Sequence, residues 1–416
     1  MLARMLTFSI LIIVLLLVDY YVFQAVVQVS KNLSEGWKLS VRLLFWLPTL
    51  LTILIILFWT FGNPYSLGPQ FRNWAITGIV GVYFSKFFAV LVLFIDDIQR
   101  GIRWMLQSFS KEESTTTQGE VLTRSEFLSK TALIAAAIPF GTMAYGIISG
   151  AHDYRIKRVT LRLPNLPQSF DGIKIGHISD IHSGSFFNKT AVKGGVEMLM
   201  NEKPDAIFFT GDLVNNESEE VKDYINIFDK LKAPLGVYSV TGNHDYGDYK
   251  KWASAEAKRK NFSDLMAAHK QMNFDLLMNE NRFLQIGTDK IAVIGIENWG
   301  GGGFAKYGKL DEAYRNTNEA AVKLLLSHDP SHWDAQVKKD YQDIDLMFSG
   351  HTHGFQFGVE IGDFKWSPSQ YAYKQWAGLY SEGNQHLYVN RGFGYIGYPG
   401  RIGMPPELTI LELKRA

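Results

Sequence analysis

Residues 173–182 read IKIGHISDIH, a short apolar run that ends in two residues of metal-binding type, Asp180 and His182. The run is rich in isoleucine and is bounded by polar residues, which predicts a buried β-strand. Side chains alternate along an extended chain, so Asp180 and His182 are expected to project from one face. The sequence therefore predicts a pair of metal ligands at the carboxyl end of a strand.

The same arrangement recurs at four further apolar runs. Residues 206–209 precede Asp212, 236–240 precede Asn243 and His244, 322–326 precede His328, and 344–348 precede His351 and His353. Polar stretches with a helical pattern lie between the runs. This alternation predicts an α/β domain of layered sheets over residues 154–416. Sites in open α/β sheets form beyond the carboxyl ends of the strands, so the five clusters are expected to meet.

The residue types at the strand ends indicate the chemistry. Seven of them supply oxygen or imidazole ligands, namely Asp180, His182, Asp212, Asn243, His328, His351 and His353. The chain contains no cysteine, and such a mixture suits manganese, iron or zinc better than calcium or magnesium. Seven ligands suit two ions that share a bridging carboxylate. Gly211, Gly242 and Gly350 permit tight turns and close backbone approach beside them.

The ordered set of motifs resembles the calcineurin-like metallophosphoesterase superfamily. It comprises Asp180-x-His182, Gly211-Asp212, Gly242-Asn243-His244-Asp245, His328 and Gly350-His351-Thr352-His353. Residues 390–394 and 405–408 resemble a membrane-associated bacterial branch that also contains UDP-2,3-diacylglucosamine hydrolases. One departure is Phe355, which follows Gly354 where that branch has a second glycine. The resemblance implies a four-layer α/β/β/α sandwich.

The resemblance also implies two divalent metal ions, with manganese as the first choice and iron or zinc as alternatives. Asp180, His182 and His353 would hold the first ion, Asn243, His328 and His351 would hold the second, and Asp212 would bridge them. A hydroxide between the ions would attack phosphorus in line. His244 would protonate the leaving oxygen or stabilise its charge.

Three further residues have expected roles at this site. Asp245 is expected either to orient His244 in catalysis or to act as a structural cap. Arg391 and Arg401 are candidates for contacting the phosphate, since a guanidinium matches its geometry.

Composition excludes several classes of protein. The 416 residues carry 42 Lys+Arg and 41 Asp+Glu, for a net charge of +1, so the basic excess of a nucleic-acid binder is missing. A hydrophobic content of 47% with 14% aromatic residues excludes a disordered chain. The absence of cysteine excludes a disulfide scaffold, thiolate-bound zinc and a thiol nucleophile.

The N-terminal third is far more apolar than the remainder. Four stretches, at about 5–29, 41–61, 75–95 and 131–149, approach the roughly 20 apolar residues that a membrane span needs. We therefore predict a transmembrane region over residues 1–150, with a polar cytoplasmic loop at about 96–130. Asp19 and Lys86 fall near the middle of two spans, which predicts either a buried ion pair or a transport or proton path.

Basic residues predict the orientation of these spans. They gather after the first span, at Lys31, Lys38 and Arg42, and after the third, at Arg100, Arg103, Lys111, Arg124 and Lys130. Such loops are usually cytoplasmic, which places the catalytic domain outside. We expect an integral protein of a bacterial inner membrane with a periplasmic catalytic domain. The aromatic stretch 364–380 is expected to be either a lipid-facing rim or a packed loop.

These observations predict a membrane-anchored, two-metal phosphoesterase. The expected activity is that of a phosphodiesterase acting on a phosphorylated lipid, a glycolipid or another envelope phosphoester. Two alternatives remain open: a non-catalytic binding domain of a transporter or receptor, and a cytoplasm-facing hydrolase of a UDP-linked lipid precursor. The expected partners are the lipid bilayer and a phosphoester, lipid-linked or not, with no nucleic acid; the sequence does not specify the oligomeric state.

Overall fold

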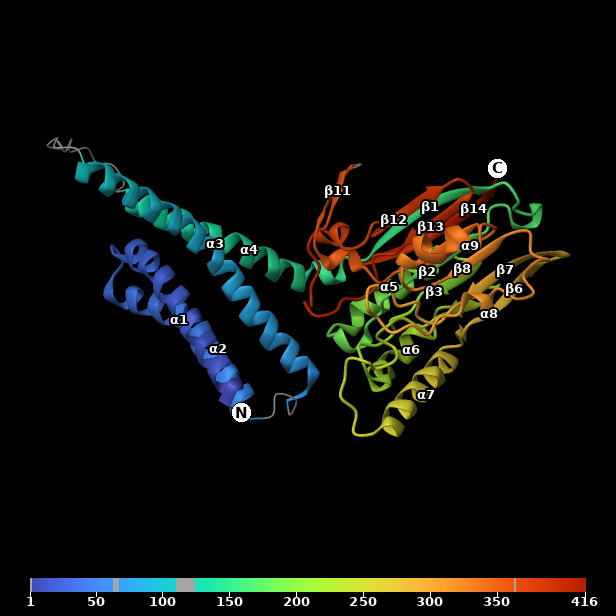
Figure 1. Cartoon of the computed structure of the whole chain (residues 1–416), viewed down its shortest axis with the longest axis horizontal. Helices are drawn as coiled ribbons and strands as arrows, with labels where there is room; N and C mark the ends of the chain where they lie inside the picture. Colours follow the sequence, from blue (N-terminus) through green and yellow to red (C-terminus); the bar gives the residue numbers. More distant parts are fainter. Residues whose placement is uncertain (1, 63–66, 110–123, 363) are drawn as a thin grey trace. The chain divides into compact units, whose positions relative to one another are not determined.

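The computed structural model describes residues 2–62, 67–109, 124–362 and 364–416 (Figure 1). The chain divides into two compact units, Met1–Tyr145 and Gly146–Ala416.

The first unit is built from long apolar helices. They are α1 (Leu2–Ser30), α2 (Glu35–Phe61), α3 (Gly68–Phe109) and α4 (Arg124–Ile148), the last of which ends in the second unit. All four are long and apolar enough to cross a membrane. The chain is therefore an integral membrane protein.

The loop expected at 96–130 is shorter than predicted. Helix α3 continues to Phe109, and α4 already begins at Arg124. Arg100 pairs with Asp96 and Asp97, one turn before it on the same helix, so these polar residues stabilise the helix and do not end it. The central part of the expected loop, residues 110–123, lies outside the described residues.

Asp19 and Lys86 meet as a buried ion pair between α1 and α3. The Asp19 carboxylate also accepts hydrogen bonds from Thr49 of α2 and Tyr83 of α3, each at 2.8 Å. Two helices thus supply partners to one carboxylate on a third, and losing one member of a buried pair typically costs roughly 3–5 kcal/mol. Of the two roles expected for this pair, the contacts favour fixing the packing of the helices.

Two six-stranded sheets form the second unit. The first has the order β1-β14-β2-β3-β4-β5, and the second has the order β12-β13-β9-β8-β7-β6. The strands of the first are β1 (Arg155–Leu163), β2 (Lys174–Ile178), β3 (Ala206–Phe209), β4 (Val237–Ser239), β5 (Asp275–Leu276) and β14 (Glu407–Arg415). Those of the second are β6 (Glu280–Ile286), β7 (Asp289–Gly295), β8 (Lys323–Leu326), β9 (Leu346–Ser349), β12 (Gly378–Glu382) and β13 (Gln385–Val389).

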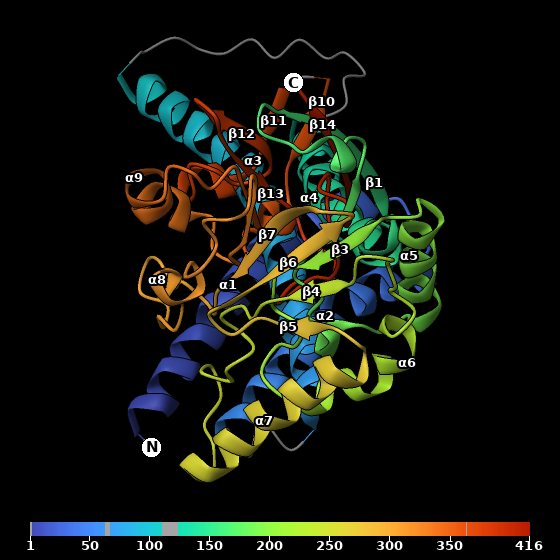
Figure 2. The ribbon, with the colours of Figure 1, turned by 90° about the vertical axis from the view of Figure 1, so that its right-hand side faces the viewer.

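Helices cover the outer face of each sheet (Figure 2). The first sheet packs against α5 (Lys189–Asn201), α6 (Ile225–Phe228) and α7 (Ala255–Gln271), and the second against α8 (Leu310–Ala313) and the turns that lead into α9 (Lys338–Asp340). Strand β3 shows why every residue of these runs is apolar: Phe208 packs between the sheets and Phe209 packs against the helices. The predicted four-layer α/β/β/α sandwich is confirmed.

Parallel pairing brings the predicted strand ends together. Strands β2, β3 and β4 run parallel in the first sheet, as do β8, β9 and β13 in the second. The apolar runs in the sequence did not predict strands β5, β6 and β12. They also did not predict a separate two-stranded sheet, formed by β10 (Val359–Ile361) and β11 (Phe364–Trp366), which stands apart in Figure 1. These strands are short or lie at a sheet edge, so they lack a continuous apolar run.

Candidate metal centre

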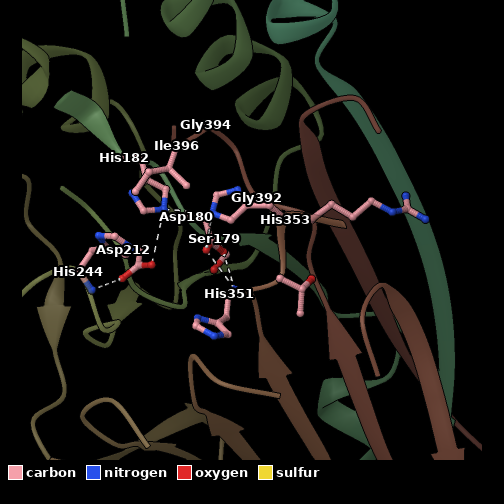
Figure 3. A network of polar contacts seen from close by, with 12 residues as sticks. Ser179, Asp180, His182, Asp212, His244, His351, His353, Gly392, Gly394 and Ile396 are labelled. Atoms are coloured by element: carbon pink, nitrogen blue, oxygen red, sulfur yellow. Dashed lines mark hydrogen bonds and ion pairs between the residues drawn. The ribbon is translucent and has the colours of Figure 1, made fainter. Parts of the chain in front are cut away.

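Asp180, Asp212, His244 and His351, which follow different strands, converge on one buried site (Figure 3), and His328, after a fifth strand, lies 3.2 Å from Asp212. The chain leaves β2 at Asp180 and His182, β3 at Asp212, β4 at Asn243 and His244, β8 at His328, and β9 at His351 and His353. The structure thus brings together six of the seven residues proposed as ligands, and Asn243 directly precedes His244, whose backbone N–H bonds Asp212.

The backbone at this site is strained. Asp180, His182, Asp212, His351 and His353 all have positive φ values, between 48° and 70°. Residues other than glycine rarely adopt this region, and such strain clusters at functional sites. The premise that Asp180 and His182 share one face of an extended chain is therefore wrong. Both reach the site through left-handed turns on either side of Ile181.

Two glycines allow the ligands to approach the backbone closely. A Cβ atom on Gly350 would lie 2.1 Å from an Asp180 carboxylate oxygen, and one on Gly242 would lie 2.3 Å from Asp212 Oδ1. No side chain fits at such distances, which explains glycine at these positions.

The first group of ligands is Asp180, His182 and His353, whose ligand atoms lie within 4.8 Å of one another. His182 Nε2 lies 3.0 Å from His353 Nε2, which lies 3.2 Å from Asp180 Oδ1. On its other side, His182 Nδ1 is 3.1 Å from Asn215 Oδ1. Donating the Nδ1 proton to Asn215 leaves Nε2 with a lone pair that faces the site.

The second group is Asp212, His328 and His351, again within 4.8 Å. His328 Nε2 lies 3.2 Å from both Asp212 Oδ2 and His351 Nδ1. The outward nitrogens have acceptors, since His328 Nδ1 bonds the Thr210 carbonyl and His351 Nε2 bonds the Tyr373 hydroxyl, each at 2.7 Å. The outer bonds again direct the inward nitrogens toward the site, where each can bind a cation once it carries no proton.

Asp212 lies between the two groups. Its Oδ2 is 3.2 Å from His328 Nε2 of the second group and 3.5 Å from His182 Nε2 of the first. Its Oδ1 accepts a hydrogen bond from the His244 backbone N–H at 2.8 Å (Figure 3). One carboxylate oxygen therefore faces both groups, as a bridging ligand would.

Asn243 is the remaining proposed ligand and directly precedes His244 in the loop after β4. Its Nδ2 donates to the Tyr249 hydroxyl at 2.8 Å, while its Oδ1 is buried and has no hydrogen-bond partner. A buried amide oxygen without a partner is costly, and a cation would satisfy it. The donor set and this unpaired oxygen fit two divalent metal ions.

His244 is oriented by a residue that the sequence reasoning missed. Its Nδ1 lies 2.8 Å from the Asn215 carbonyl oxygen. Asp245, expected either to orient His244 or to cap the loop, is buried and accepts hydrogen bonds from the backbone N–H groups of Asp212, Leu213, Val214 and Gly242, at 2.8–3.3 Å. The structure therefore supports the structural role for Asp245 and not the catalytic one.

The side chains of both candidate phosphate ligands bond other groups of the protein. Arg401 is buried and donates to backbone carbonyls, including those of Gly394 at 2.9 Å and Arg391 at 2.8 Å. The Arg391 side chain pairs with Glu407 at 3.1 Å and Glu360 at 3.3 Å. Arg401 Nη2 also lies 3.4 Å from Nδ1 of the ligand His353. Contact of either side chain with phosphate stays a prediction. The Arg401 bonds go to backbone carbonyls, which every residue offers, so the local sequence gave no sign of them.

Comparison with known proteins identifies the family. Residues 3–151 match the transmembrane domain of probable calcineurin-like phosphoesterases, and residues 173–355 match the calcineurin-like phosphoesterase domain. YkuE, an uncharacterized metallophosphoesterase of Bacillus subtilis, is 30% identical over 290 residues, covering 66% of this chain and 94% of YkuE. The chain belongs to the calcineurin-like metallophosphoesterases. This metallophosphoesterase is therefore a hydrolase anchored by apolar helices.

Two further relatives match a similar part of the chain. A transmembrane protein with a metallophosphoesterase domain from Danio rerio is 28% identical, over 68% of this chain and 62% of the relative. The uncharacterized metallophosphoesterase Cj0846 of Campylobacter jejuni is 29% identical, over 62% of this chain and 63% of the relative. This chain thus spans somewhat less than two thirds of either relative.

The affinity of this metallophosphoesterase for metal should rise with pH. Burial lowers the pKa of His351 to about 4, so that ligand is already neutral near pH 7. Burial would also lower the pKa of His328, but Asp212 and Asp180 raise it to about 10. His328 therefore holds a proton that metal must displace, and the Mn²⁺ dissociation constant should fall roughly tenfold per pH unit below that value.

Calorimetric titration of the chelator-treated, full-length protein with Mn²⁺ at about pH 6.5, 7.5 and 8.5 would measure this dependence. Repeating the titration in buffers of different ionisation enthalpy would count the protons released. An Mn²⁺ affinity that is the same at all three pH values would contradict the assignment of His328.

Asn215→Ala should weaken metal binding by roughly 10- to 100-fold, because His182 loses the acceptor that fixes its Nδ1 proton. The bond from His244 to the backbone carbonyl of residue 215 can persist in this variant. Asn216→Ala, which shortens the next side chain, is the matched control. Competition with a metal-sensitive dye would measure both variants, and equal affinities would show that Asn215 does not position His182.

Proposed function

We propose that this membrane-anchored metallophosphoesterase is a phosphodiesterase with two metal ions that acts on a phosphoester at the membrane surface. The observation that carries the proposal is the position of Asp212 Oδ2, which faces His182 of one ligand group and His328 of the other. The unpaired Asn243 Oδ1 supports the same arrangement.

Each proposed ligand is assigned to one or both metal ions. Asp180, His182 and His353 would hold one ion, Asn243, His328 and His351 would hold the other, and Asp212 would contact both. Two such ions, when bound, polarise the phosphoryl oxygens and lower the pKa of a water molecule for in-line attack. The carboxylate, amide and imidazole ligands suit manganese, which we propose as the native metal ahead of iron or zinc.

His244 is the proposed general acid. Its Nδ1 is occupied by the Asn215 carbonyl, so Nε2 is the nitrogen that remains to carry a proton. The ring lies 4.9 Å from that of His182, beside the ligands, and is half-buried. An imidazolium can act as a general acid and donate that proton to the leaving oxygen.

Charge favours a phosphodiester over a phosphomonoester. A monoester carries up to two negative charges, which guanidinium groups commonly neutralise. Arg391 and Arg401 are instead committed to carboxylates and backbone carbonyls. Arg401 lies beside the site, with Nη2 3.4 Å from Nδ1 of the ligand His353, but its donors already have protein acceptors. Without a guanidinium that is free to neutralise a second charge, the site better fits the single negative charge of a diester.

The membrane helices limit where the substrate lies. A domain that follows four candidate spans stays near the bilayer, so phosphorylated lipids, glycolipids and other envelope phosphoesters are within its reach. We propose one of these as the substrate class.

Hydrolysis of bis(p-nitrophenyl) phosphate by the full-length protein tests the chemistry. Turnover should require Mn²⁺, disappear with chelator, and exceed turnover of p-nitrophenyl phosphate. Asp212→Asn should lower kcat by at least about 100-fold, because the shared carboxylate is lost. Asp345→Asn is the control, since Asp345 is a largely buried carboxylate that accepts a bond from the Lys323 backbone away from the site.

His244→Ala should lower kcat by roughly 100- to 10,000-fold while the metal content stays unchanged. His386→Ala changes a half-buried histidine of β13 that bonds Ser381, and it should leave both quantities unchanged. Metal-stimulated turnover that survives Asp212→Asn would refute the two-metal mechanism. Loss of metal together with activity in His244→Ala would make His244 a ligand.

We also propose that the catalytic domain faces outward from a bacterial inner membrane. Lys31, Lys38 and the basic residues after the third span support this orientation, because basic loops are usually cytoplasmic. The chain has no cysteine, so a single Thr288→Cys substitution in the exposed β6–β7 turn provides a unique label. A membrane-impermeant maleimide should label it in cells with permeabilised outer membranes, and labelling only after lysis would place the domain in the cytoplasm.

A further inference from the structure

The two-stranded sheet of β10 and β11 has one apolar and one polar face. Its register pairs Val359 with Trp366, Glu360 with Lys365, and Ile361 with Phe364. Cross-strand partners lie on the same face of a sheet, and successive residues lie on opposite faces. The side chains of one face, called here the apolar hairpin face, are therefore those of Val359, Ile361, Phe364 and Trp366.

The polar face contacts the domain. Glu360 pairs with Lys157 of β1 at 3.1 Å and with Arg391 at 3.3 Å. Lys365 Nζ donates to the Ala377 carbonyl at 2.7 Å. The apolar hairpin face is left outward, with Ile361 73% and Phe364 62% exposed. This orientation is the reverse of that in ordinary antiparallel sheets, which place their apolar face on the core.

Aromatic side chains next to the sheet enlarge the apolar hairpin face. Trp366 lies 6.1 Å from the Phe357 ring, and its Nε1 donates to the Tyr371 hydroxyl at 3.3 Å. Tyr371 is 78% exposed. Tryptophan and tyrosine in such a setting are typical of membrane interfaces, where their rings span apolar and wet layers.

Phe355, which precedes the hairpin, is a separate indication that exposed apolar side chains here contact something outside the domain. It has a φ of 56° and is 64% exposed. A bulky residue at positive φ is strained, and packing within the domain does little to offset that strain at an exposed side chain. Contact with something outside the domain would offset it.

The base of the hairpin is tied to the residues at which the chain leaves its fourth candidate span. Gly358 N–H donates to the Ile402 carbonyl at 2.9 Å, and Arg401 N–H donates to the Gly146 carbonyl at 3.1 Å. Gly146 lies in the last turn of α4, within the second unit. One short loop thus contacts both the hairpin and the end of a membrane-spanning helix.

From these contacts we propose that the apolar hairpin face inserts into the lipid interface of the membrane that the helices span. A bilayer next to α4 is a continuous apolar partner, and outward apolar side chains gain free energy by leaving water there.

Insertion would also place lipid beside the metal centre. The segment that carries β10 and β11 starts just after the ligand His353 and ends near Tyr373, whose hydroxyl bonds His351. A lipid phosphodiester held at this surface would have its headgroup near the two ligand groups. This last step rests on the proposed function, whereas insertion itself does not.

Single-cysteine labelling of the full chain tests the insertion. Ile361→Cys places an environment-sensitive nitrobenzoxadiazole label on the apolar hairpin face. The matched control, Thr288→Cys, is exposed in the turn of another hairpin, β6–β7. Both proteins would be placed in nanodiscs of phosphatidylcholine and phosphatidylglycerol, which leave both membrane sides accessible. Spin-labelled lipid and aqueous iodide then serve as opposing quenchers.

The label at position 361 should be quenched by spin-labelled lipid at least about threefold more than the label at 288, and iodide should show the opposite order. Phe364→Cys, on the facing strand, should behave like Ile361→Cys and guards against a folding defect in one variant. Iodide quenching at 361 as strong as at 288 would overturn the proposal. So would protection from both quenchers, which would indicate a protein partner such as a second copy of the chain.

The quenching result does not depend on catalysis. Melting temperatures report whether each labelled protein is folded, and they need no turnover. A protein that inserts the hairpin but never hydrolyses bis(p-nitrophenyl) phosphate would refute the proposed function alone. A protein that turns over that substrate with its hairpin in water would refute the insertion alone.

Discussion

The Asp212 carboxylate is the point at which the two halves of the sandwich meet. Its Oδ2 faces His182, which follows a strand of the first sheet, and His328, which follows a strand of the second. Burial would raise the pKa of Asp212, but His328 and His244 hold it well below the usual range. A charge so deeply buried needs a positive partner, either a protonated histidine or a cation. The two sheets must therefore keep their present positions relative to one another, because the histidines that face this charge follow strands of both sheets.

The backbone around Asp212 shows what this arrangement costs. Five ligands adopt left-handed conformations, and Gly242 and Gly350 occupy positions where any Cβ would collide with a ligand carboxylate. Strain of this kind persists where the surrounding structure enforces it. Here Asp245 does so, because its carboxylate ties the loop after Asp212 to Gly242 through backbone N–H groups. The loops are thus held in place, and the ligands face inward before any metal binds.

The sequence predicted the core strands because each is buried on both faces and reads as an unbroken apolar run, as at 206–209. It predicted where the ligands meet because parallel strands end at a common edge. It did not predict the partners of Arg401, which are backbone carbonyls that every residue offers, nor those of Arg391, which are carboxylates 16 and 31 residues away. Asn215 was missed because its role depends on two histidines from other strands, and the β10–β11 hairpin was missed because its apolar residues face outward.

The most direct test of a two-metal centre bridged by Asp212 is anomalous X-ray scattering from crystals of the full-length protein grown with Mn²⁺. We expect two anomalous peaks, one within each ligand group, with Asp212 contacting both. Asn243 Oδ1 should contact the ion held by His328 and His351. A single peak, or a second peak that does not contact Asp212, would contradict the two-metal centre on which the proposed hydrolysis depends.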